Sequence, residues 1–497
     1  MKLGHWLALA AAGVVLIATA TYVFRNIGYI YEEGFPHQRV IPVVLPHDLS
    51  SDPTSAIDGL HAPASRLTAL PQSTIDDRCR LHLSSQWPTF AVACGESVWP
   101  VLSETYQGNW FYYASYVWQV PFGDSVPSLR LMAVLMGVFG LWLLFTVVRR
   151  EGGTAAGLVA AALLACHNVY VASSGLAYYY ETMPMLFALG AYGALQRERA
   201  VLSVLLLSAA ISLKATVGIL VLPFGWFYWQ QRHLFGTRFK LALAGVAFLV
   251  PMLPFLVHEL LCVTRGIPES SFFHTLASRG DTLSDWTRIP SMLWHSLAWG
   301  FAFGGNLNGI TGPLFGREEM PWLRVDLILL FAAALAFAIY RWRKGEILQF
   351  EKLALLCMVA AFCESVILYA TKTDIQAYVY VLPFIVALNA TFLCRLVGRW
   401  GTPALVAVVL LHAVQLAEVV IDSRSPSRLI ASADAQQQIC DAVRDLDAPV
   451  VTTNYNHIGM LEHCTGNKVH PVHAYFPLSP GGTGEQLRTR LQAAARG

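Results

Sequence analysis

The sequence predicts an all-α polytopic membrane protein with about eleven transmembrane helices. Of its 497 residues, 55% are hydrophobic and only 13% are charged, and the mean hydropathy is +0.49. These values exclude an ordinary soluble domain. Apolar runs of bilayer-spanning length recur along the chain, and basic residues gather in alternate junctions between them. The formal net charge of +2 gives no sign of a nucleic-acid partner.

The apolar runs lie near residues 6–24, 127–148, 155–173, 182–196, 200–213, 215–229, 241–262, 321–340, 353–371, 375–394 and 402–421. With Met1 in the cytoplasm, every even-numbered junction should be basic. Each one is, through Arg149 and Arg150; Arg197 and Arg199; Arg232, Arg238 and Lys240; Arg341, Arg343 and Lys344; and Arg395 and Arg399. The alternation therefore predicts three long outer segments, 25–126, 263–320 and the tail from 422.

The first run follows Lys2 and continues to Phe24 without a clean cleavage site. We expect it to remain as a signal anchor, with a cleaved signal peptide as the alternative. Either choice leaves the orientation of the other helices unchanged. The orientation predicts a functional face on the periplasmic or exterior side, and we expect the membrane to be a bacterial inner membrane.

Aromatic residues characterise the first two outer segments. Residues 44–77 are polar and predict irregular chain, whereas Trp87 to Pro121 is rich in tryptophan and tyrosine, and 263–320 repeats the aromatic mixture. Such rings favour the headgroup region. We therefore expect amphipathic helices lying on the outer leaflet in both segments.

The tail changes character near Ser432. An amphipathic stretch leads to the β-branched run from Val450 to Thr453, and further helices are expected at 458–463 and 485–496. The sequence therefore predicts two domains: a transmembrane domain over 1–421, which includes the outer loops 25–126 and 263–320, and a small outer α/β appendage over 422–497.

Four of the nine cysteines form two close pairs in the outer segments, Cys79 with Cys94 and Cys440 with Cys464. In an oxidising compartment these pairs are candidates for local disulfides. Unpaired thiols are the alternative. No cysteine spacing resembles a zinc site.

Carboxylates near the membrane surface are the first candidates for chemistry. Glu32 and Glu33 follow the first helix among aromatic residues, where either could act as a general base. Glu181 lies in a short outer turn after three tyrosines, and a carboxylate there is costly unless it is paired, hydrated or bound to a metal. The alternatives are a solvated acidic turn for the pair and a favourable helix N-terminus for Glu181.

Three cations are expected at the same face. Arg130 begins the second helix, Lys214 interrupts the apolar run between the fifth and sixth, and Lys372 follows the ninth. Each could extend toward the headgroups on its own. Together with the three carboxylates they indicate binding of a lipid phosphate beside an acid or base.

These features resemble the GT-C superfamily of membrane glycosyltransferases, in particular the branch similar to protein O-mannosyltransferases and aminoarabinose transferases. The family's acidic pair after the first helix is matched by Tyr31-Glu32-Glu33, with Glu in place of the usual Asp. Further matches are Phe122-Gly123 followed by Leu129-Arg130, then Glu181, Lys214, Lys372 and the segment Tyr380-Val381-Leu382-Pro383. The resemblance extends over most of the transmembrane domain.

The resemblance implies transfer of a hexose or pentose from a polyprenyl-phosphate donor to a hydroxyl of a lipid, glycan or protein acceptor, with inversion. Glu32, or else Glu33, would take the acceptor proton. Arg130, Lys214 and Lys372 would stabilise the departing phosphate. Glu181 would orient the acceptor or hold a divalent cation, which some members of the superfamily use; no other cofactor is implied.

Other functions remain open from the sequence. A flippase or transporter would usually show internal repeats and polar residues at the bilayer midplane, which are scarce here. A polysaccharide polymerase or ligase would place its long loop late in the chain. A non-catalytic assembly protein is the third alternative.

Overall fold

A computed structural model describes residues 3–24, 60–61, 80–83, 90–94, 97–104, 107–108, 110–123, 126–175, 179–265, 273, 286–297, 325–368, 379–401, 403, 406, 409–414, 417, 433–444, 451–452 and 472–474. The chain divides into two compact units. The helical unit comprises Met1–Arg25, Arg130–Leu260 and Ser271–Arg428, and the mixed unit comprises Asn26–Leu129, Leu261–Ser270 and Leu429–Gly497.

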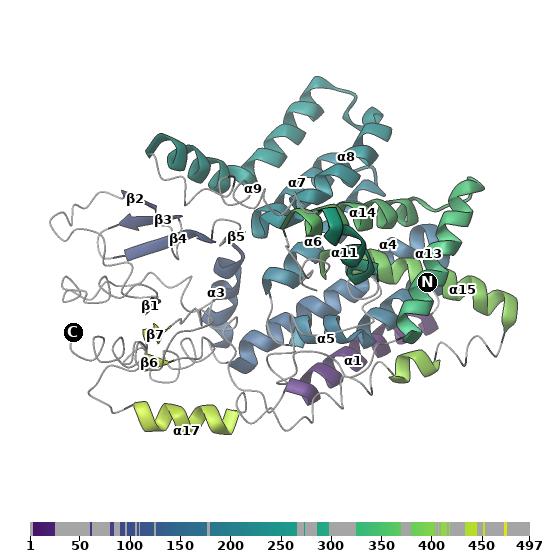
Figure 1. Ribbon diagram of the computed structural model, residues 1–497, viewed down its shortest axis with the longest axis horizontal. Coiled ribbons are helices and arrows are strands. Elements are labelled where there is room, and N and C mark those ends of the chain that lie inside the picture. The colour runs from purple at the N-terminus through teal and green to yellow at the C-terminus, as the bar shows by residue number, and fades with distance from the viewer. Residues whose placement is uncertain are drawn as a thin grey trace. The chain divides into compact units, whose positions relative to one another are not determined.

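Helices dominate the helical unit (Figure 1). In chain order they are α1 (Leu3–Phe24), α4 (Val126–Cys166), α5 (Asn168–Gly175), α6 (Tyr179–Leu195), α7 (Ala200–Leu213), η5 (Ala215–Leu220), α8 (Val221–Gln230), η6 (Arg232–Phe235), α9 (Arg238–Arg265), η9 (Trp286–Arg288), α11 (Ile289–His295), α13 (Val325–Arg343), α14 (Gln349–Leu368) and α15 (Leu382–Trp400). Helix α4 begins in the mixed unit. Of the predicted run 402–421 only scattered positions are described, so the number of eleven helices stays a prediction.

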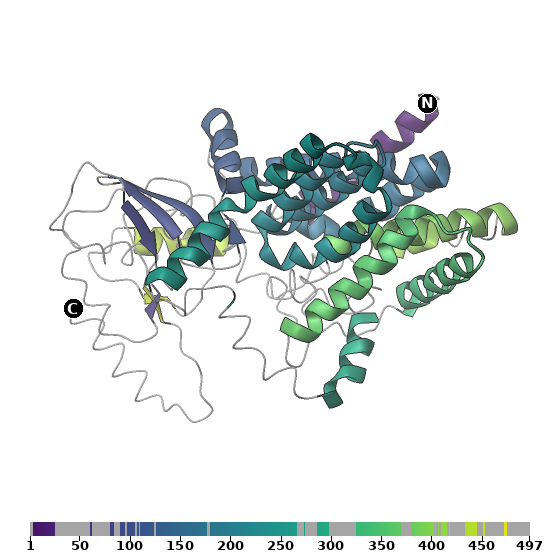
Figure 2. The same cartoon turned by 90° about the horizontal axis from the view of Figure 1, so that it is seen from above.

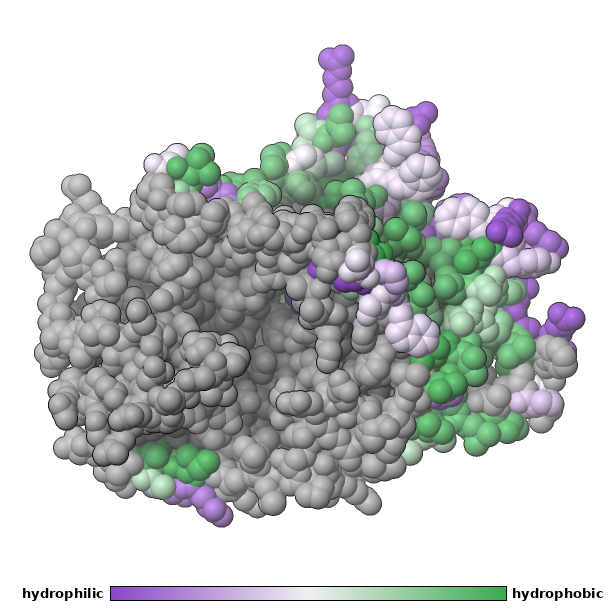
Figure 3. Space-filling model, in the orientation of Figure 1, coloured by the Kyte–Doolittle hydropathy of each residue, from purple (hydrophilic) through white to green (hydrophobic). Residues whose placement is uncertain are grey.

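Five stretches of the described helices are long and apolar enough to cross a membrane: Leu3–Tyr22, Pro127–Cys166, Arg238–Thr264, Val325–Arg343 and Val379–Arg399. Thr182–Leu195 and Ala200–Leu213 are shorter apolar helices. In the apolar part of α9 only 17% of the residues are buried. Hydrophobic residues cover much of the visible face of the described helices (Figure 3). A surface of this kind is expected where helices face lipid, so the protein is an integral membrane protein.

The two runs predicted at 127–148 and 155–173 are joined within α4. Gly153 interrupts this helix with φ 87° and ψ 170°, a backbone conformation that side chains other than glycine's rarely adopt. Arg149 and Arg150 immediately precede it. The basic junction between the two runs is therefore a sharp kink at a glycine, without an intervening loop.

Helices α6 and α7 form a hairpin, because residues 196–199 alone connect them. Leu206 packs against Gly190 within this hairpin, so α7 runs back along α6. Gly190 and Gly193 also lie against Leu143 of α4. Glycines at these positions let three helices approach closely. The predicted run 200–213 has the same bounds as α7.

A carboxylate joins α4, α6 and α14 near the Gly153 kink. Glu151 accepts hydrogen bonds from the Tyr192 hydroxyl and from Gln196 Nε2, each at 2.6 Å, and from the backbone N–H of Phe350 at 3.0 Å. The start of α14 is thus held beside the kink and beside the end of α6.

A buried ion pair joins α13, α14 and α15. The guanidinium of Arg341 contacts the Glu351 carboxylate at 2.8 Å, and the Thr391 hydroxyl donates to the same carboxylate at 3.0 Å. The backbone N–H of Leu348 adds a further hydrogen bond at 2.9 Å. Arg341 is 7% exposed and Glu351 is fully buried. Such a pair is tolerated in an apolar interior only because its hydrogen bonds are satisfied.

Strands and two helices make up the described part of the mixed unit. The strands are β1 (Leu60–His61), β2 (Arg80–Leu83), β3 (Phe90–Cys94), β4 (Ser97–Glu104), β5 (Gln107–Gly108), β6 (Val451–Thr452) and β7 (Val472–Ala474); the helices are α3 (Trp110–Phe122) and α17 (Ala433–Val443). Strands β2 to β5 form an antiparallel sheet in sequence order, and β2, β3 and β4 lie side by side in both views (Figure 1 and Figure 2).

The aromatic stretch from Trp87 to Pro121 corrects one expectation. It is helical only from Trp110, because Phe90–Cys94 and Ser97–Glu104 pair as strands. Small and apolar residues alternate in Phe90-Ala-Val-Ala-Cys94, a pattern of period two that suits a strand. Helices were predicted here from the aromatic composition, although the alternating pattern favoured a strand.

The tail shares a sheet with the first outer segment. Strand β7 pairs with β1 in an antiparallel ladder and with β6 in a parallel one, so residues 60–61, 451–452 and 472–474 form a single three-stranded sheet. The compact unit that contains the tail also contains residues 26–129, and the predicted appendage over 422–497 stays a prediction.

Removing the charge from the buried ion pair should destabilise the helical unit. We expect Glu351→Gln to cost about 3–5 kcal/mol, because the Arg341 guanidinium would be left buried without a counter-charge. Unfolding of the purified protein in mixed micelles measures this loss. Glu346→Gln changes an exposed carboxylate nearby and should leave stability unchanged; equal stability of both variants would contradict the role of the pair.

The predicted Cys79–Cys94 disulfide stays a prediction, because Cys79 lies outside the described residues, whereas Cys94 ends β3. We expect peptide mapping without reductant to recover a peptide joining Cys79 to Cys94, and Cys94→Ser to release a free Cys79 thiol. Recovery of both cysteines as free thiols from the oxidised wild type would refute the pair. Cys440 in α17 is disulfide-bonded, and its pairing with Cys464 stays a prediction.

Candidate functional site

The structure describes three of the six predicted site positions. Arg130 lies in the first turns of α4, Glu181 in the first turn of α6, and Lys214 between α7 and η5. Glu32, Glu33 and Lys372 lie outside the described residues. Their roles remain predictions from the sequence.

The α6–α7 hairpin brings Glu181 and Lys214 to the same end of the helical unit. Leu206 contacts Gly190, and both Thr182 and Lys214 lie about 12 Å along their helices from that contact, at 1.5 Å per residue. Glu181 precedes Thr182 directly. The backbone register therefore places position 181 at the level of Lys214.

Lys214 occupies a break in the backbone. It ends α7 in an extended conformation with φ −148° and ψ 106°, and its carbonyl accepts a hydrogen bond from the Val217 N–H at 3.0 Å as η5 begins. The residue is only 8% exposed. An ammonium group buried between apolar helices is costly, and such residues in membrane proteins usually serve function.

Arg130 lies at the same end of α4. This helix runs parallel to α6, because Leu143 and Val147 of α4 lie against Gly190 and Gly193 of α6. Arg130 precedes Leu143 by about 20 Å of helix and Glu181 precedes Gly190 by about 14 Å, so Arg130 lies about 6 Å further toward that end than the first turn of α6. The side chain of Arg130 is half-buried.

Polar residues hold the beginning of α6 against α5. The hydroxyl of Thr182 donates to the Ser173 carbonyl at 3.1 Å, and Thr182, Ser173 and Ser174 are all buried. The Tyr170 hydroxyl in turn donates to the Gly137 carbonyl of α4 at 2.6 Å. These bonds place the acidic first turn of α6 within a rigid group of three helices.

Glu364 is a further ionisable residue at this level. It lies about 21 Å along α14 from Phe350, which is bonded to Glu151 near the kink. Lys214 lies a similar distance along α7 from Arg199. Both residues are therefore remote from the arginine-rich end of the bundle and lie at one depth in it.

The Glu364 carboxylate accepts a hydrogen bond from the Tyr380 hydroxyl, and both residues are buried, at 5% and 1% exposed. This hydrogen bond gives the buried carboxylate a partner. Tyr380 opens the Tyr-Val-Leu-Pro segment that precedes α15. The sequence did not identify it as the partner, because the two residues meet only through packing of α14 on α15.

One other residue was missed as a member of this region. Arg288, in the second outer segment, donates from Nη2 to the Val366 carbonyl of α14 at 3.0 Å, two residues beyond Glu364. Nothing in the sequence signals the contact of Arg288 with α14.

The arrangement suits binding of an anion beside an acid. Lys214 supplies positive charge at the depth of Glu364 and of the first turn of α6, where apolar surroundings strengthen electrostatic attraction, and Arg130 lies further toward the same end. Among the residues that the structure describes, no three histidine, cysteine, aspartate or glutamate side chains gather as metal ligands. Glu181 would have to share a divalent cation with residues outside that part of the chain.

No protein-family model and no curated protein matches the sequence. Similar solved structures include the oligosaccharyltransferase AglB of Archaeoglobus fulgidus, in complex with an inhibitory peptide and a dolichol-phosphate. It is 12% identical with a TM-score of 0.45, and 97% of this chain matches 65% of that chain. This chain thus spans less than two thirds of AglB.

ArnT from Cupriavidus metallidurans, bound to undecaprenyl phosphate, is 15% identical with a TM-score of 0.49, and 93% of this chain matches 85% of ArnT. AglB and ArnT are members of the GT-C superfamily, which the sequence motifs resemble. Both TM-scores are below 0.5, so no residue role or substrate is carried over from either protein.

Proposed function

We propose that the protein is an integral membrane glycosyltransferase that moves a sugar from a polyprenyl-phosphate donor to an acceptor hydroxyl, with inversion, on the non-cytoplasmic side. The observation that supports this most is that the buried residues Lys214 and Glu364 lie about 21 Å from the arginine-rich end of an apolar bundle, at the depth of the first turn of α6, which carries Glu181. The basic junctions lie at the arginine-rich end, which favours a cytoplasmic position for that end of the bundle.

The reaction requires a base, and Glu32 is our first candidate, with Glu33 the second. The acceptor oxygen attacks the anomeric carbon from the face opposite the phosphate, and its proton passes to the carboxylate. The bond between the anomeric carbon and the phosphate oxygen breaks, and its electron pair stays on the phosphate. This assignment rests on the acidic motif after the first helix.

Lys214 is placed to stabilise the leaving phosphate. The phosphate gains negative charge as the glycosidic bond breaks, and a fixed cation in an apolar site stabilises that charge more than water-exposed cations do. Arg130 lies at the same end of the bundle, and Lys372 is assigned a similar role from the sequence. An apolar bundle surface would contact the polyprenyl chain.

Glu181 would orient the acceptor hydroxyl or hold a divalent cation against the phosphate. The second role requires ligands from Glu32 or Glu33, because the described residues supply no further carboxylate cluster. The Tyr380–Glu364 bond positions the start of α15 against α14 at this depth. These residues would shape the site without touching the reacting atoms.

Replacing both candidate bases should abolish transfer. We expect Glu32→Gln with Glu33→Gln to lower kcat by about 10²–10⁴-fold, since a general base contributes that much. Transfer from radiolabelled polyprenyl-phosphate sugars in membranes measures the effect, and Glu198→Gln, an exposed glutamate in the 196–199 connection, is the matched control. Full transfer by the double variant would refute the mechanism, and uptake of lipid-linked sugar without transfer would favour the flippase alternative.

The lysine provides a second test. We expect Lys214→Ala to lower kcat by about 10²–10³-fold, the usual loss when one group that stabilises developing negative charge is removed. Lys214→Arg keeps the charge and should recover part of the rate. Lys240→Ala removes an exposed lysine at the start of α9 and should be neutral. A kcat for Lys214→Ala equal to that of Lys240→Ala would exclude Lys214 from the reaction.

A further inference from the structure

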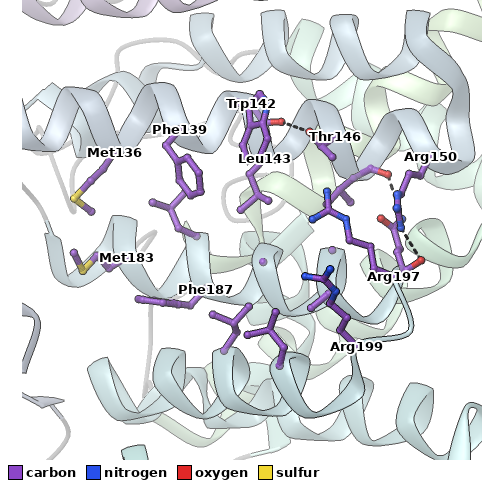
Figure 4. Close-up of a pocket in the computed structure, with 18 residues that line it drawn as sticks. Met136, Phe139, Trp142, Leu143, Thr146, Arg150, Met183, Phe187, Arg197 and Arg199 are labelled. Atoms are coloured by element: carbon purple, nitrogen blue, oxygen red, sulfur yellow. Dashed lines mark hydrogen bonds between the residues drawn. The ribbon is translucent and has the colours of Figure 1, made fainter. Parts of the chain in front are cut away.

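A groove with a volume of about 450 Å³ lies between α4, α6 and α7. Figure 4 shows Arg150, Arg197 and Arg199 gathered at one end of it and Met136 and Met183 at the other. The groove is therefore at the arginine-rich end of the bundle. From there it runs along α4 and α6 toward the first turn of α6, where Met183 lies two residues from Glu181.

Apolar side chains line the body of the groove. From Arg150 to Met136 the lining follows α4 for about 21 Å, which exceeds the depth of one leaflet, about 15 Å of a 30 Å hydrocarbon core. Phe139 and Leu202 are 51% and 39% exposed, so the groove is open along its side. Its shape and polarity suit a single acyl chain.

At the arginine-rich end of the groove, positive charge is available to bind an anion. Arg150 donates to the Gln196 carbonyl at 2.7 Å, while Arg197 and Arg199 are exposed. Within the described part of the chain, neither Arg197 nor Arg199 has a carboxylate within 4 Å. The nearby Glu151 carboxylate is occupied by three donors from other residues.

We propose that this groove binds an anionic phospholipid, with its phosphodiester at Arg197 and Arg199 and one acyl chain along α4 toward Met136. Guanidinium groups recognise phosphate through paired charge-assisted hydrogen bonds. A basic pocket between helices at the cytoplasmic side is the kind of site that takes an anionic headgroup. The basic junctions predict that these arginines face the cytoplasmic leaflet, which supplies such lipids. The inference does not depend on the proposed sugar transfer.

Native mass spectrometry of the delipidated full-length protein in detergent tests the site. Dioleoyl phosphatidylglycerol and dioleoyl phosphatidylcholine are titrated separately, so that headgroup charge is the only difference between the probes. We expect the wild type to bind the anionic lipid at least about tenfold more tightly, and Arg197→Ala with Arg199→Ala to remove that preference. The double variant Arg238→Ala with Arg343→Ala removes two exposed arginines outside the groove and should retain the preference for the anionic lipid.

A second pair of variants tests the groove without changing its charge. Leu202 lines the groove and Leu205, one turn along the same helix, does not. Leu202→Trp should fill the apolar channel and weaken phosphatidylglycerol binding about tenfold, whereas Leu205→Trp should leave it unchanged. Arg197→Lys with Arg199→Lys keeps both charges and should retain most of the preference.

Three results would overturn the proposal. The first is equal binding of the two lipids by the wild type, and the second is unchanged phosphatidylglycerol binding by Leu202→Trp or by the alanine pair. The third is displacement of phosphatidylglycerol by an equal concentration of undecaprenyl phosphate, which would assign the groove to a polyprenyl chain. Each of these experiments measures lipid binding. Loss of transfer activity in the Glu32 and Glu33 variants would therefore neither support nor contradict the lipid site.

Discussion

The carboxylate of Glu151 sets the relative heights of three helices, and the position of the candidate site depends on it. It accepts hydrogen bonds from Tyr192 and Gln196 of the α6 end and from the Phe350 N–H at the start of α14. Helices are stiff and rise by a constant 1.5 Å per residue, so heights fixed at one end are fixed at the other. The depth shared by Lys214 and Glu364 therefore follows from contacts made about 21 Å away.

Charges at the two ends of the bundle are held differently. At the arginine-rich end they are either exposed, as in Arg197, or satisfied by complete sets of partners, as in Arg341 with Glu351. At the opposite end two of the described ionisable residues, Lys214 and Glu364, are buried in the bundle. The first arrangement supports stability. The second carries a desolvation cost, which marks these two residues as candidates for function.

Local patterns predicted the helices well and their partners poorly. The run 200–213 was predicted at the bounds of α7 because Arg199 and Lys214 end it on both sides, and apolarity over that length is a local property. The pairing of Glu351 with Arg341 depends on how helices pack, which periodicity does not encode. The strand Phe90–Cys94 was missed because aromatic composition was weighed above alternation. For the site, the roles of Glu181 and Lys214 stay predictions from the sequence, whereas the contact of Arg288 with α14 required the tertiary structure.

Arg150 shows that orientation in the membrane and folding are not separable at this position. Its charge contributes to the rule that keeps basic junctions in the cytoplasm, and its guanidinium also caps the end of α6 through the Gln196 carbonyl. A lysine would preserve the charge read during insertion but would lack the planar fork that makes this contact. Selection acting on topogenesis alone would accept either residue, and selection on the folded bundle would favour arginine. The residue at this junction is thus constrained twice, first by its charge during membrane insertion and later by its hydrogen bond in the folded bundle.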